Sequence, residues 1–165
     1  MTLDYPTDPD VTTVYDALGR KTSVTDATGT WAYTYDGTSA RVATVTDPDG
    51  NVLSYTYDAC GERASMSLTV GATTVTDLDY TYTDGRLTQI DAPGTAGVPP
   101  ALFSYSYLAN SNLVSSLVHN NGTSDILTTT RTWDDADRLL SIASAADTPP
   151  TTTVTSYAYT LDAQV

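Results

Sequence analysis

Large and small side chains alternate in short stretches along the whole chain. The pattern is clear in residues 31–35, 53–57, 78–82 and 103–107, where aromatic or aliphatic residues are separated by Ala, Ser, Thr or Asp. A period of two places the large residues on one face of a β-strand and the small ones on the other. The abundant Thr, Val and Tyr also favour strands, and no stretch shows sustained helical periodicity. The pattern therefore predicts an all-β chain.

These stretches belong to a phrase that recurs from end to end: an aromatic residue, a small residue, a second aromatic residue, usually Asp, a turn and usually Arg. The second aromatic residue, called the anchor below, is 20 to 26 residues from the next anchor. That step is too short for helix-pair repeats of about 34 residues, and it fits two short strands with two turns. The seven anchors are Tyr15, Tyr35, Tyr57, Tyr82, Tyr107, Trp133 and Tyr159.

Turn residues follow each anchor, as in 16–19, 58–61 and 84–85, where Asp and Gly suit tight reversals. A second strand then begins, and each repeat is interpreted as one β-hairpin. Segments with Pro and Gly connect one hairpin to the next. The second strands are expected at 41–45, 86–90 and 138–142, and the connections at 47–51, 91–100 and 147–150.

One hairpin cannot bury its apolar face alone, so successive hairpins are expected to pair edge to edge in one continuous, curved antiparallel sheet. Tyrosines of neighbouring repeats should then stack in rows across the sheet. The repeat motif is interpreted as structural, with an aromatic ligand platform as the alternative. The motif residues are Tyr15, Asp16, Gly19, Arg20, Tyr33, Tyr35, Asp36, Arg41, Tyr55, Tyr57, Asp58, Gly61, Arg63, Tyr80, Tyr82, Gly85, Arg86, Tyr105, Tyr107, Trp133, Asp134, Arg138, Tyr157 and Tyr159.

Residues 15–20, Tyr-Asp-Ala-Leu-Gly-Arg, resemble the YD repeat of Rhs-type proteins, whose consensus is close to Tyr-Asp-x-x-Gly-Arg-Leu. The resemblance covers essentially the whole chain and is strong in the first three copies. It weakens afterwards, because Leu108 stands where Asp is expected, Asn112 is taken for the Arg position, and Trp133 replaces Tyr.

The resemblance implies a fold and a setting. YD repeats occur in bacterial Rhs polymorphic toxins, in C components of insecticidal toxin complexes, in wall-associated proteins and in teneurins, where hairpins form a sheet that spirals into a hollow shell. It implies that residues 1–165 are a single array covering part of such a shell, in a secreted or cell-surface bacterial protein. The last copy stops where its second strand should begin, which indicates a fragment. An open edge strand is then expected to pair with another copy or with neighbouring repeats.

The charge is strongly negative, with 20 acidic residues against 7 basic ones and a net charge of −13. Phosphate binding needs Lys and Arg, so this balance disfavours nucleic acid and anionic membrane surfaces as partners. No apolar run is long enough to cross a membrane as a helix. An apolar content of 40% permits a core.

Candidate chemistry is sparse. Asp47, Asp49 and Asn51 offer closely spaced oxygen ligands of the kind that calcium prefers, but the segment lacks the closing Glu of a calcium loop, so a plain turn is the main interpretation. Cys60 is the single cysteine and His119 the single histidine, and they lie in different repeats. No catalytic constellation or cofactor motif is present, so no enzyme and no cofactor are expected.

Two classes of function remain. The first is a non-catalytic structural segment of a YD-repeat shell or surface protein. The second is an extracellular interaction module that binds glycans or a cell-surface partner through exposed aromatic residues flanked by carboxylates. Trp31 and Trp133 are the residues that would distinguish the two classes.

Overall fold

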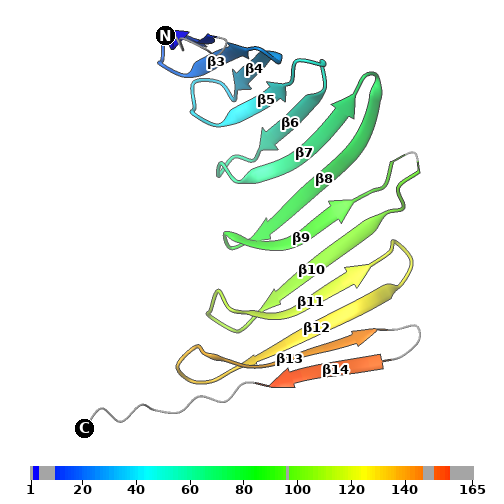
Figure 1. Ribbon diagram of the computed structural model, residues 1–165. Coiled ribbons are helices and arrows are strands. Elements are labelled where there is room, and N and C mark those ends of the chain that lie inside the picture. Colours follow the sequence, from blue (N-terminus) through cyan, green and yellow to red (C-terminus); the bar gives the residue numbers. More distant parts are fainter. Residues whose placement is uncertain (1, 4–9, 96, 147–150, 157–165) are drawn as a thin grey trace. The chain divides into compact units, whose positions relative to one another are not determined.

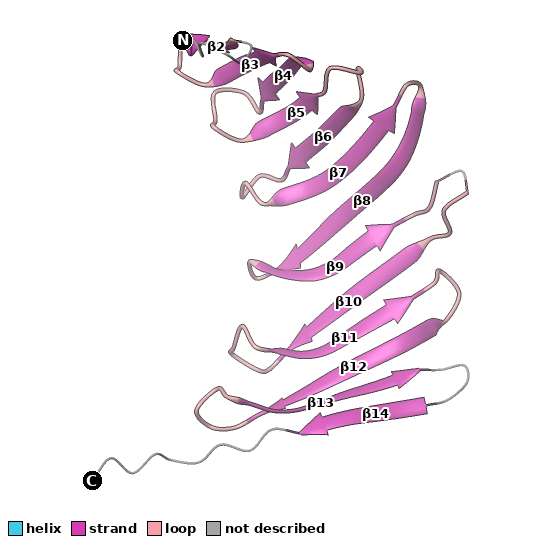
Figure 2. Ribbon diagram, in the orientation of Figure 1, coloured by secondary structure: helices cyan, strands magenta, loops and turns pink. Residues whose placement is uncertain are grey.

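The chain forms β-strands that follow one another in chain order (Figures 1 and 2). The computed structural model describes residues 2–3, 10–95, 97–146 and 151–156, and no helix occurs among them. The strands are β1 (Thr2–Leu3), β2 (Val11–Tyr15), β3 (Lys21–Asp26), β4 (Gly29–Tyr35), β5 (Val42–Thr46), β6 (Val52–Tyr57), β7 (Arg63–Val70), β8 (Thr73–Thr83), β9 (Arg86–Ala92), β10 (Ala101–Tyr107), β11 (Val114–Asn120), β12 (Asp125–Trp133), β13 (Leu139–Ala146) and β14 (Thr151–Ser156).

The strand order β1 to β14 makes one open sheet, and the paired strands run antiparallel. This confirms the all-β fold of consecutive hairpins that the alternation predicted. The curvature of the sheet stays a prediction. The copy that contains Tyr157 and Tyr159 lies outside the described residues.

The chain divides into two compact units. The first comprises Met1–Asp79 with Gly94–Val98, and the second comprises Tyr80–Pro93 with Pro99–Val165. The first unit therefore holds β1 to β7 and the beginning of β8, and the second holds the end of β8 and β9 to β14. The assignment of residues 1–165 to a single array stays a prediction.

In the first unit the two faces of the sheet differ in chemistry. Residues directly opposite each other in a ladder share a face, and Val45 is opposite both Tyr33 and Leu53. On the other face Thr44 is opposite both Thr34 and Ser54. We call these the tyrosine face and the hydroxyl face. Hydroxyl groups pair across strands on the latter, as in Thr34–Thr44 at 2.7 Å, Thr25–Thr30 at 2.8 Å and Thr56–Ser65 at 2.7 Å.

The second unit repeats this division. Tyr105 is opposite Leu117 on the tyrosine face, and Ser106 is opposite Ser116 on the hydroxyl face. Phe103 stacks on the ring of His119 with centroids 4.5 Å apart and planes 14° apart. The single histidine thus lies in β11, on the tyrosine face.

The strand register does not place the tyrosines of neighbouring repeats in stacked rows, contrary to the expectation from the sequence. The second strand of each hairpin lies between successive tyrosine strands, so Tyr33 is opposite Val45, and Tyr55 is opposite Met66. Aliphatic residues therefore alternate with tyrosines across the sheet. The rings instead contact cationic side chains, as described below.

A buried core is also missing from the part of the chain that the structure describes, although the composition permits one. None of these residues is buried. A sheet buries a face only against a second layer, and the described strands form one layer. Stability must therefore come from ladders, cross-strand pairs and the loops.

Candidate functional site

The loop that joins β2 to β3 is organised around the carboxylate of Asp16. Its Oδ1 accepts the backbone N–H groups of Leu18 and Arg20, each at 2.9 Å. Its Oδ2 accepts the Arg20 Nε–H at 2.7 Å in an ion pair. The backbone closes the loop, because Asp16 N–H donates to the Arg20 carbonyl at 2.9 Å. One aspartate thus caps a five-residue loop and holds its arginine.

Three further loops repeat this five-residue geometry. They are Asp47–Asn51, Asp58–Glu62 and Asp134–Arg138, and in each the first residue donates its N–H to the carbonyl of the fifth. In each, the carboxylate of the first residue also accepts the N–H groups of the third and fifth residues. The fifth position holds Asn51, Glu62 and Arg138 in turn. The side chain of the fifth residue can therefore vary without a change in the loop.

The third copy of the motif is aligned differently from what its sequence suggests. Glu62 occupies the place of Arg20, because its N–H and carbonyl both bond to Asp58. Arg63 is one residue further and starts β7, where its guanidinium lies 4.4 Å from the ring centroid of Tyr55. The motif residue Arg63 is thus placed over a tyrosine and not in the loop.

Two loops are one residue longer. In Asp36–Arg41 and in Leu108–Leu113 the first N–H donates to the last carbonyl at 2.9 Å. A serine hydroxyl, from Ser39 or Ser111, accepts the N–H of the last residue. Leu113 therefore takes the place of Arg41, and Asn112 does not stand in the Arg position.

Left-handed backbone is required at the fourth residue of the five-residue loops. Gly19 and Gly61 have φ of 75° and 86°, values that glycine adopts without strain. Asp137 takes the same place in the last described loop with φ of 60°. The hairpin of β8 and β9 is closed differently, by a two-residue turn in which Asp84 and Gly85 both have positive φ, as a type I′ turn requires.

Some hairpins have a five- or six-residue loop directly after the anchor. Each of these hairpins contains a β-bulge, and its register shifts in the step before the anchor. The register shifts between Val14 and Tyr15, between Thr34 and Tyr35, and between Thr56 and Tyr57. It shifts in the same place before Tyr107 and Trp133. The extra residue lies on the second strand of each hairpin, as Thr22 does between Lys21 and Ser23, and not on the strand of the anchor. The second strand therefore bends opposite the anchor in both units.

Four of these anchors bond to the hairpin that precedes them in the chain. The hydroxyl of Tyr35 donates to the carbonyl of Lys21 at 2.6 Å, and that of Tyr57 to the carbonyl of Val42 at 2.8 Å. In the second unit Tyr107 donates to Leu87 at 2.6 Å, and the indole Nε1–H of Trp133 donates to Val114 at 3.0 Å. In all four cases the acceptor directly follows the residue that closes the preceding loop or turn. Trp133 therefore preserves the bond although it replaces tyrosine.

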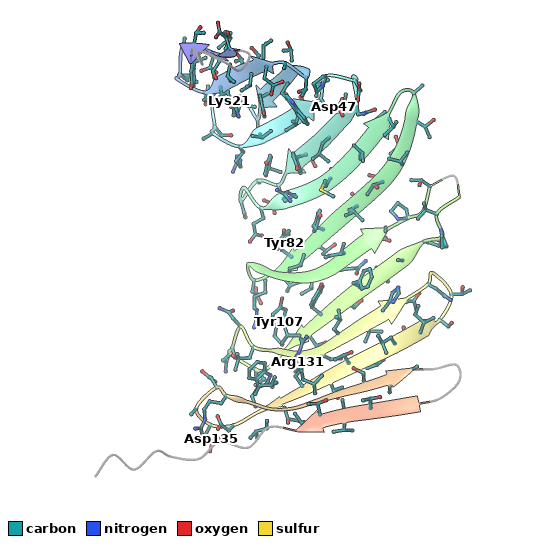
Figure 3. The ribbon with its side chains drawn as sticks, viewed as in Figure 1. Lys21, Asp47, Tyr82, Tyr107, Arg131 and Asp135 are labelled. Atoms are coloured by element: carbon teal, nitrogen blue, oxygen red, sulfur yellow. The ribbon has the colours of Figure 1, made fainter. Side chains whose placement is uncertain are left out.

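Arginines of the preceding hairpins stack on three of these anchors, Tyr35, Tyr57 and Tyr107. The guanidinium of Arg20 lies 4.5 Å from the ring centroid of Tyr35 and donates to the carbonyls of Gly37 and Ser39. Arg86 lies 5.2 Å from Tyr107 and donates to Ser111. Arg41 lies 5.1 Å from the ring of Tyr57. We call the anchor bond together with this arginine stack the inter-hairpin clamp. Figure 3 shows Tyr82, Tyr107 and Asp135 toward the same end of the strands of the second unit.

A second set of cations covers the first tyrosine of the motif. Lys21 Nζ lies 4.1 Å from the ring centroid of Tyr33, and Arg63 lies similarly over Tyr55. Such contacts contribute about 0.5 to 1 kcal/mol each at exposed sites. Sequence reasoning missed these pairs, since they depend on the register between strands.

Hydrogen bonds within turns and loops lower the pKa of Asp16, Asp26, Asp47 and Asp134. Donation from the Arg20 backbone N–H is the main cause that holds the pKa of Asp16 below its usual range, and Arg138 acts likewise on the pKa of Asp134. The pKa of Asp47 is lowered chiefly by the side-chain amide of Asn51, and that of Asp26 by the hydroxyl of Thr28. In each case the donors favour the charged carboxylate.

The calcium candidates lie in the loop between β5 and β6. Asp47 accepts N–H groups from Asp49 and Asn51 and the side-chain Nδ2–H of Asn51 at 2.8 Å. These donors occupy the oxygens that a cation would need. Across the described ranges of the chain, no group of three or more His, Cys, Asp or Glu is arranged to hold a metal ion. The loop geometry fits the plain turn.

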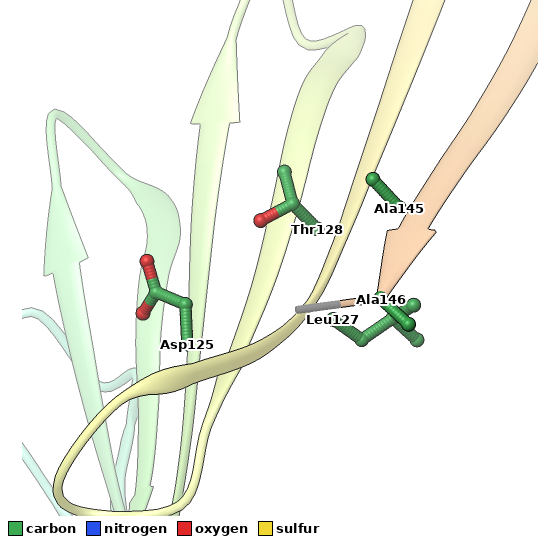
Figure 4. Close-up of a pocket in the computed structure, with 5 residues that line it drawn as sticks. All are labelled: Asp125, Leu127, Thr128, Ala145 and Ala146. Atoms are coloured by element: carbon green, nitrogen blue, oxygen red, sulfur yellow. The ribbon is translucent and has the colours of Figure 1, made fainter. Parts of the chain in front are cut away.

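Two other features offer little chemistry. Cys60 is exposed in its loop. An open depression of about 240 Å³ is lined by Asp125, Leu127, Thr128, Ala145 and Ala146 (Figure 4). These residues lie at the beginning of β12 and the end of β13. No converging set of polar groups is present there.

Comparison with known proteins assigns the repeat. Residues 35–74 match the family model described as RHS Repeat. The segment of residues 35–74 is thus similar to an RHS repeat. The matched segment includes the loops that begin at Asp36, Asp47 and Asp58 and the clamp between Tyr57 and Val42. No curated protein sequence matches the chain.

The fold is shared with solved structures that contain toxin proteins. One is the crystal structure of TcdB2-TccC3-Cdc42, with a TM-score of 0.61 and 18% identity over 84% of this chain. A second is a Tc holotoxin pore from Photorhabdus luminescens with a mutated TccC3, with a TM-score of 0.58 and 15% identity over 90%. The crystal structure of TcdB2-TccC3-TEV has a TM-score of 0.51 and 15% identity over 90%. The chain spans 7%, 9% and 10% of those chains, and at these identities the likeness shows the fold alone.

Among the described residues, none belongs to a helix that is long and apolar enough to cross a membrane.

Proposed function

We propose that this chain is a non-catalytic, structural segment of a larger RHS-type wall, in a secreted or cell-surface bacterial protein such as a toxin shell. The inter-hairpin clamp carries the proposal. The clamp connects one hairpin to the next through the anchor, the arginine and the carbonyl of the residue that follows the preceding loop or turn. The motif residues in the clamp therefore stabilise the array. A repeat array of this kind works through its assembled surface.

The clamp predicts that stability is shared between neighbouring hairpins. Tyr57→Ala removes the bond to Val42 and the ring beneath Arg41. Backbone amides of β4 and β5 should then exchange faster, together with those of β6 and β7, because repeat stability depends on nearest-neighbour interfaces. Tyr15→Ala is the matched control, since Tyr15 is 50% exposed. Faster exchange confined to β6 and β7 would contradict a clamped array.

The proposed partners are neighbouring repeats or another copy, joined through the edges of the sheet. β1 and β14 end the strand order, and an edge strand offers unpaired backbone groups. Light scattering coupled to size exclusion should show mass that grows with protein concentration. A monomer of 17.5 kDa at every concentration would contradict edge pairing.

A second candidate function is supported by Trp31. Its side chain is 37% exposed on the tyrosine face, and Asp26 lies on the same face, since Val24 is opposite Trp31 and Asp26 is opposite Gly29. An exposed indole beside a carboxylate suits the binding of a glycan or of a cell-surface partner. Trp133 is bonded to Val114 and serves as the structural counterpart. Trp31→Ala should abolish glycan-array binding and leave the circular dichroism spectrum unchanged. Absence of binding by the parent protein would remove this function.

A further inference from the structure

Tyr15 differs from the other anchors that the structure describes. Its hairpin has the same bulge and the same five-residue loop as that of Tyr57. Yet Tyr15 is 50% exposed, whereas the later anchors are half-buried. Leu18 in the adjoining loop is also exposed. Tyr15 is thus an anchor in a hairpin of the usual geometry, but its side chain is exposed.

The other clamps show what covers an anchor. Tyr57 is covered by the second strand of the preceding hairpin, whose Val42 carbonyl accepts the hydroxyl and whose Arg41 lies over the ring. Tyr35 is covered in the same way by Lys21 and Arg20. The occupant of an anchor surface is therefore defined by two groups, a loop-closing arginine and the carbonyl that follows it.

We propose that Tyr15 forms a docking surface for one further hairpin of the same kind, continuous with β1. This inference rests on the proposed structural function and names the partner of its first described hairpin. Tyr57 is the matched case, because both anchors precede a five-residue loop. The guanidinium of Arg41 lies 5.1 Å from the ring centroid of Tyr57, so the added hairpin should place an arginine over Tyr15.

The pairing register of β1 with β2 fixes the position that the arginine of such a hairpin must take. Thr2 is opposite Thr12, three residues before Tyr15, and Thr44 is opposite Ser54, three residues before Tyr57. Thr2 thus takes the place of Thr44. Arg41 precedes Thr44 by three residues, so an arginine three residues ahead of Thr2 would lie over Tyr15.

An extended variant of the chain can test this docking surface. A variant in which residues 31–43 are joined directly to Thr2 places a copy of Arg41 in the required position and a copy of Val42 against Tyr15. Amide exchange of residues 14–15 should slow by about tenfold relative to the parent chain. Tyr15→Phe should reverse most of this slowing in the extended variant and change little in the parent. A Gly/Ser extension of equal length and Arg41→Gln in the added copy are the matched controls.

Equal exchange at residues 14–15 in the extended variant and the Gly/Ser control would overturn the proposal. So would an equal effect of Tyr15→Phe with and without the added hairpin. A separate peptide of residues 31–43 gives a second measurement that does not depend on folding of the longer chain. It should slow exchange at residues 14–15 saturably, and no slowing at millimolar peptide would also overturn the proposal. The exchange of β4 to β7 reports the array itself, so failure of the docking surface and failure of the structural function are distinguishable.

Discussion

The loop Asp36–Arg41 of the first unit and the loop Leu108–Leu113 of the second have the same length and the same closing backbone bonds. The first carries an exposed ion pair, with Arg41 Nη2 at 2.9 Å from Asp36 Oδ2. The second carries leucines at both positions. The loop is therefore formed by its backbone and by the serine that caps it, and the aspartate–arginine pair is an addition. What persists in both is the anchor bond, from Tyr57 to Val42 and from Trp133 to Val114.

If the anchor is the essential part, its removal should cost the most. Trp133→Ala removes a half-buried indole and its bond to Val114. We expect the free energy of unfolding to fall by about 2 kcal/mol, less than for a fully buried tryptophan. Trp133→Phe keeps a ring and loses the bond, so a fall of about 1 kcal/mol is expected. Urea unfolding measures both variants, and an unchanged stability of Trp133→Phe would show that the bond is irrelevant to the clamp.

The loops that begin at Asp16, Asp47 and Asp134 should lose stability together in acid, whereas Leu108–Leu113 has no carboxylate at its first position. The folded pKa values of Asp16, Asp47 and Asp134 are lowered, so these groups contribute stability above about pH 4, where the unfolded carboxylates also ionise. That contribution is lost as the pH falls through the folded pKa values. Urea midpoints at pH 7, 4 and 3 should decrease in that order. Asp16→Asn should weaken this dependence, and an unchanged dependence would argue against the loop carboxylates as its source.

The cap itself can be tested where no arginine accompanies it. Asp58 Oδ1 accepts the N–H groups of Cys60 and Glu62, each at 2.9 Å. Asp58→Ala should lower the free energy of unfolding by about 1 kcal/mol, the usual contribution of a capping side chain. Asp58→Asn retains an acceptor oxygen and should cost less. Equal losses in the two variants would mean that charge, and not the hydrogen bonds, stabilises this loop.

The placement of Glu62 at the arginine position makes a prediction of its own. Two carboxylates, Asp58 and Glu62, share this loop, whereas Arg20 pairs with Asp16 in the equivalent one. Glu62→Arg should raise the free energy of unfolding by about 0.2 to 1 kcal/mol. Arg63→Gln is the control, since it removes only the contact with Tyr55. A destabilised Glu62→Arg variant would contradict the loop alignment.

The smallest effect is expected from repair of the degraded loop. Leu108→Asp combined with Leu113→Arg should recreate the ion pair of Asp36 and Arg41 and place a guanidinium near Trp133. The gain should be at most about 1 kcal/mol and should disappear at high salt, because exposed ion pairs are weak and screened. A gain that persists in 1 M salt would require a different cause, such as stacking on the indole.

How much of this could be predicted is clearest in the loops. The alternation at 31–35, 53–57 and 103–107 correctly gave β4, β6 and β10, and the Asp and Gly positions gave the turns. The arginine positions were harder, because loops of five and six residues coexist. Only the backbone bonds distinguish Glu62 from Arg63 and Leu113 from Asn112. The residue types alone favoured Arg63 and Asn112, whereas Glu62 and Leu113 close the loops.

The sequence by itself determined the all-β fold, the hairpin period and the place of the turns that follow the anchors, since these follow from local alternation and turn chemistry. Tertiary structure decided the rest. The ring of Tyr57 lies against the preceding hairpin, and that neighbour supplies both the carbonyl of Val42 and the guanidinium of Arg41. The carbonyls that accept the anchor bonds lie 14 to 20 residues away in the chain. A pattern of period two contains no information about contacts across such distances, because they depend on register between strands and not on the order of residues within one.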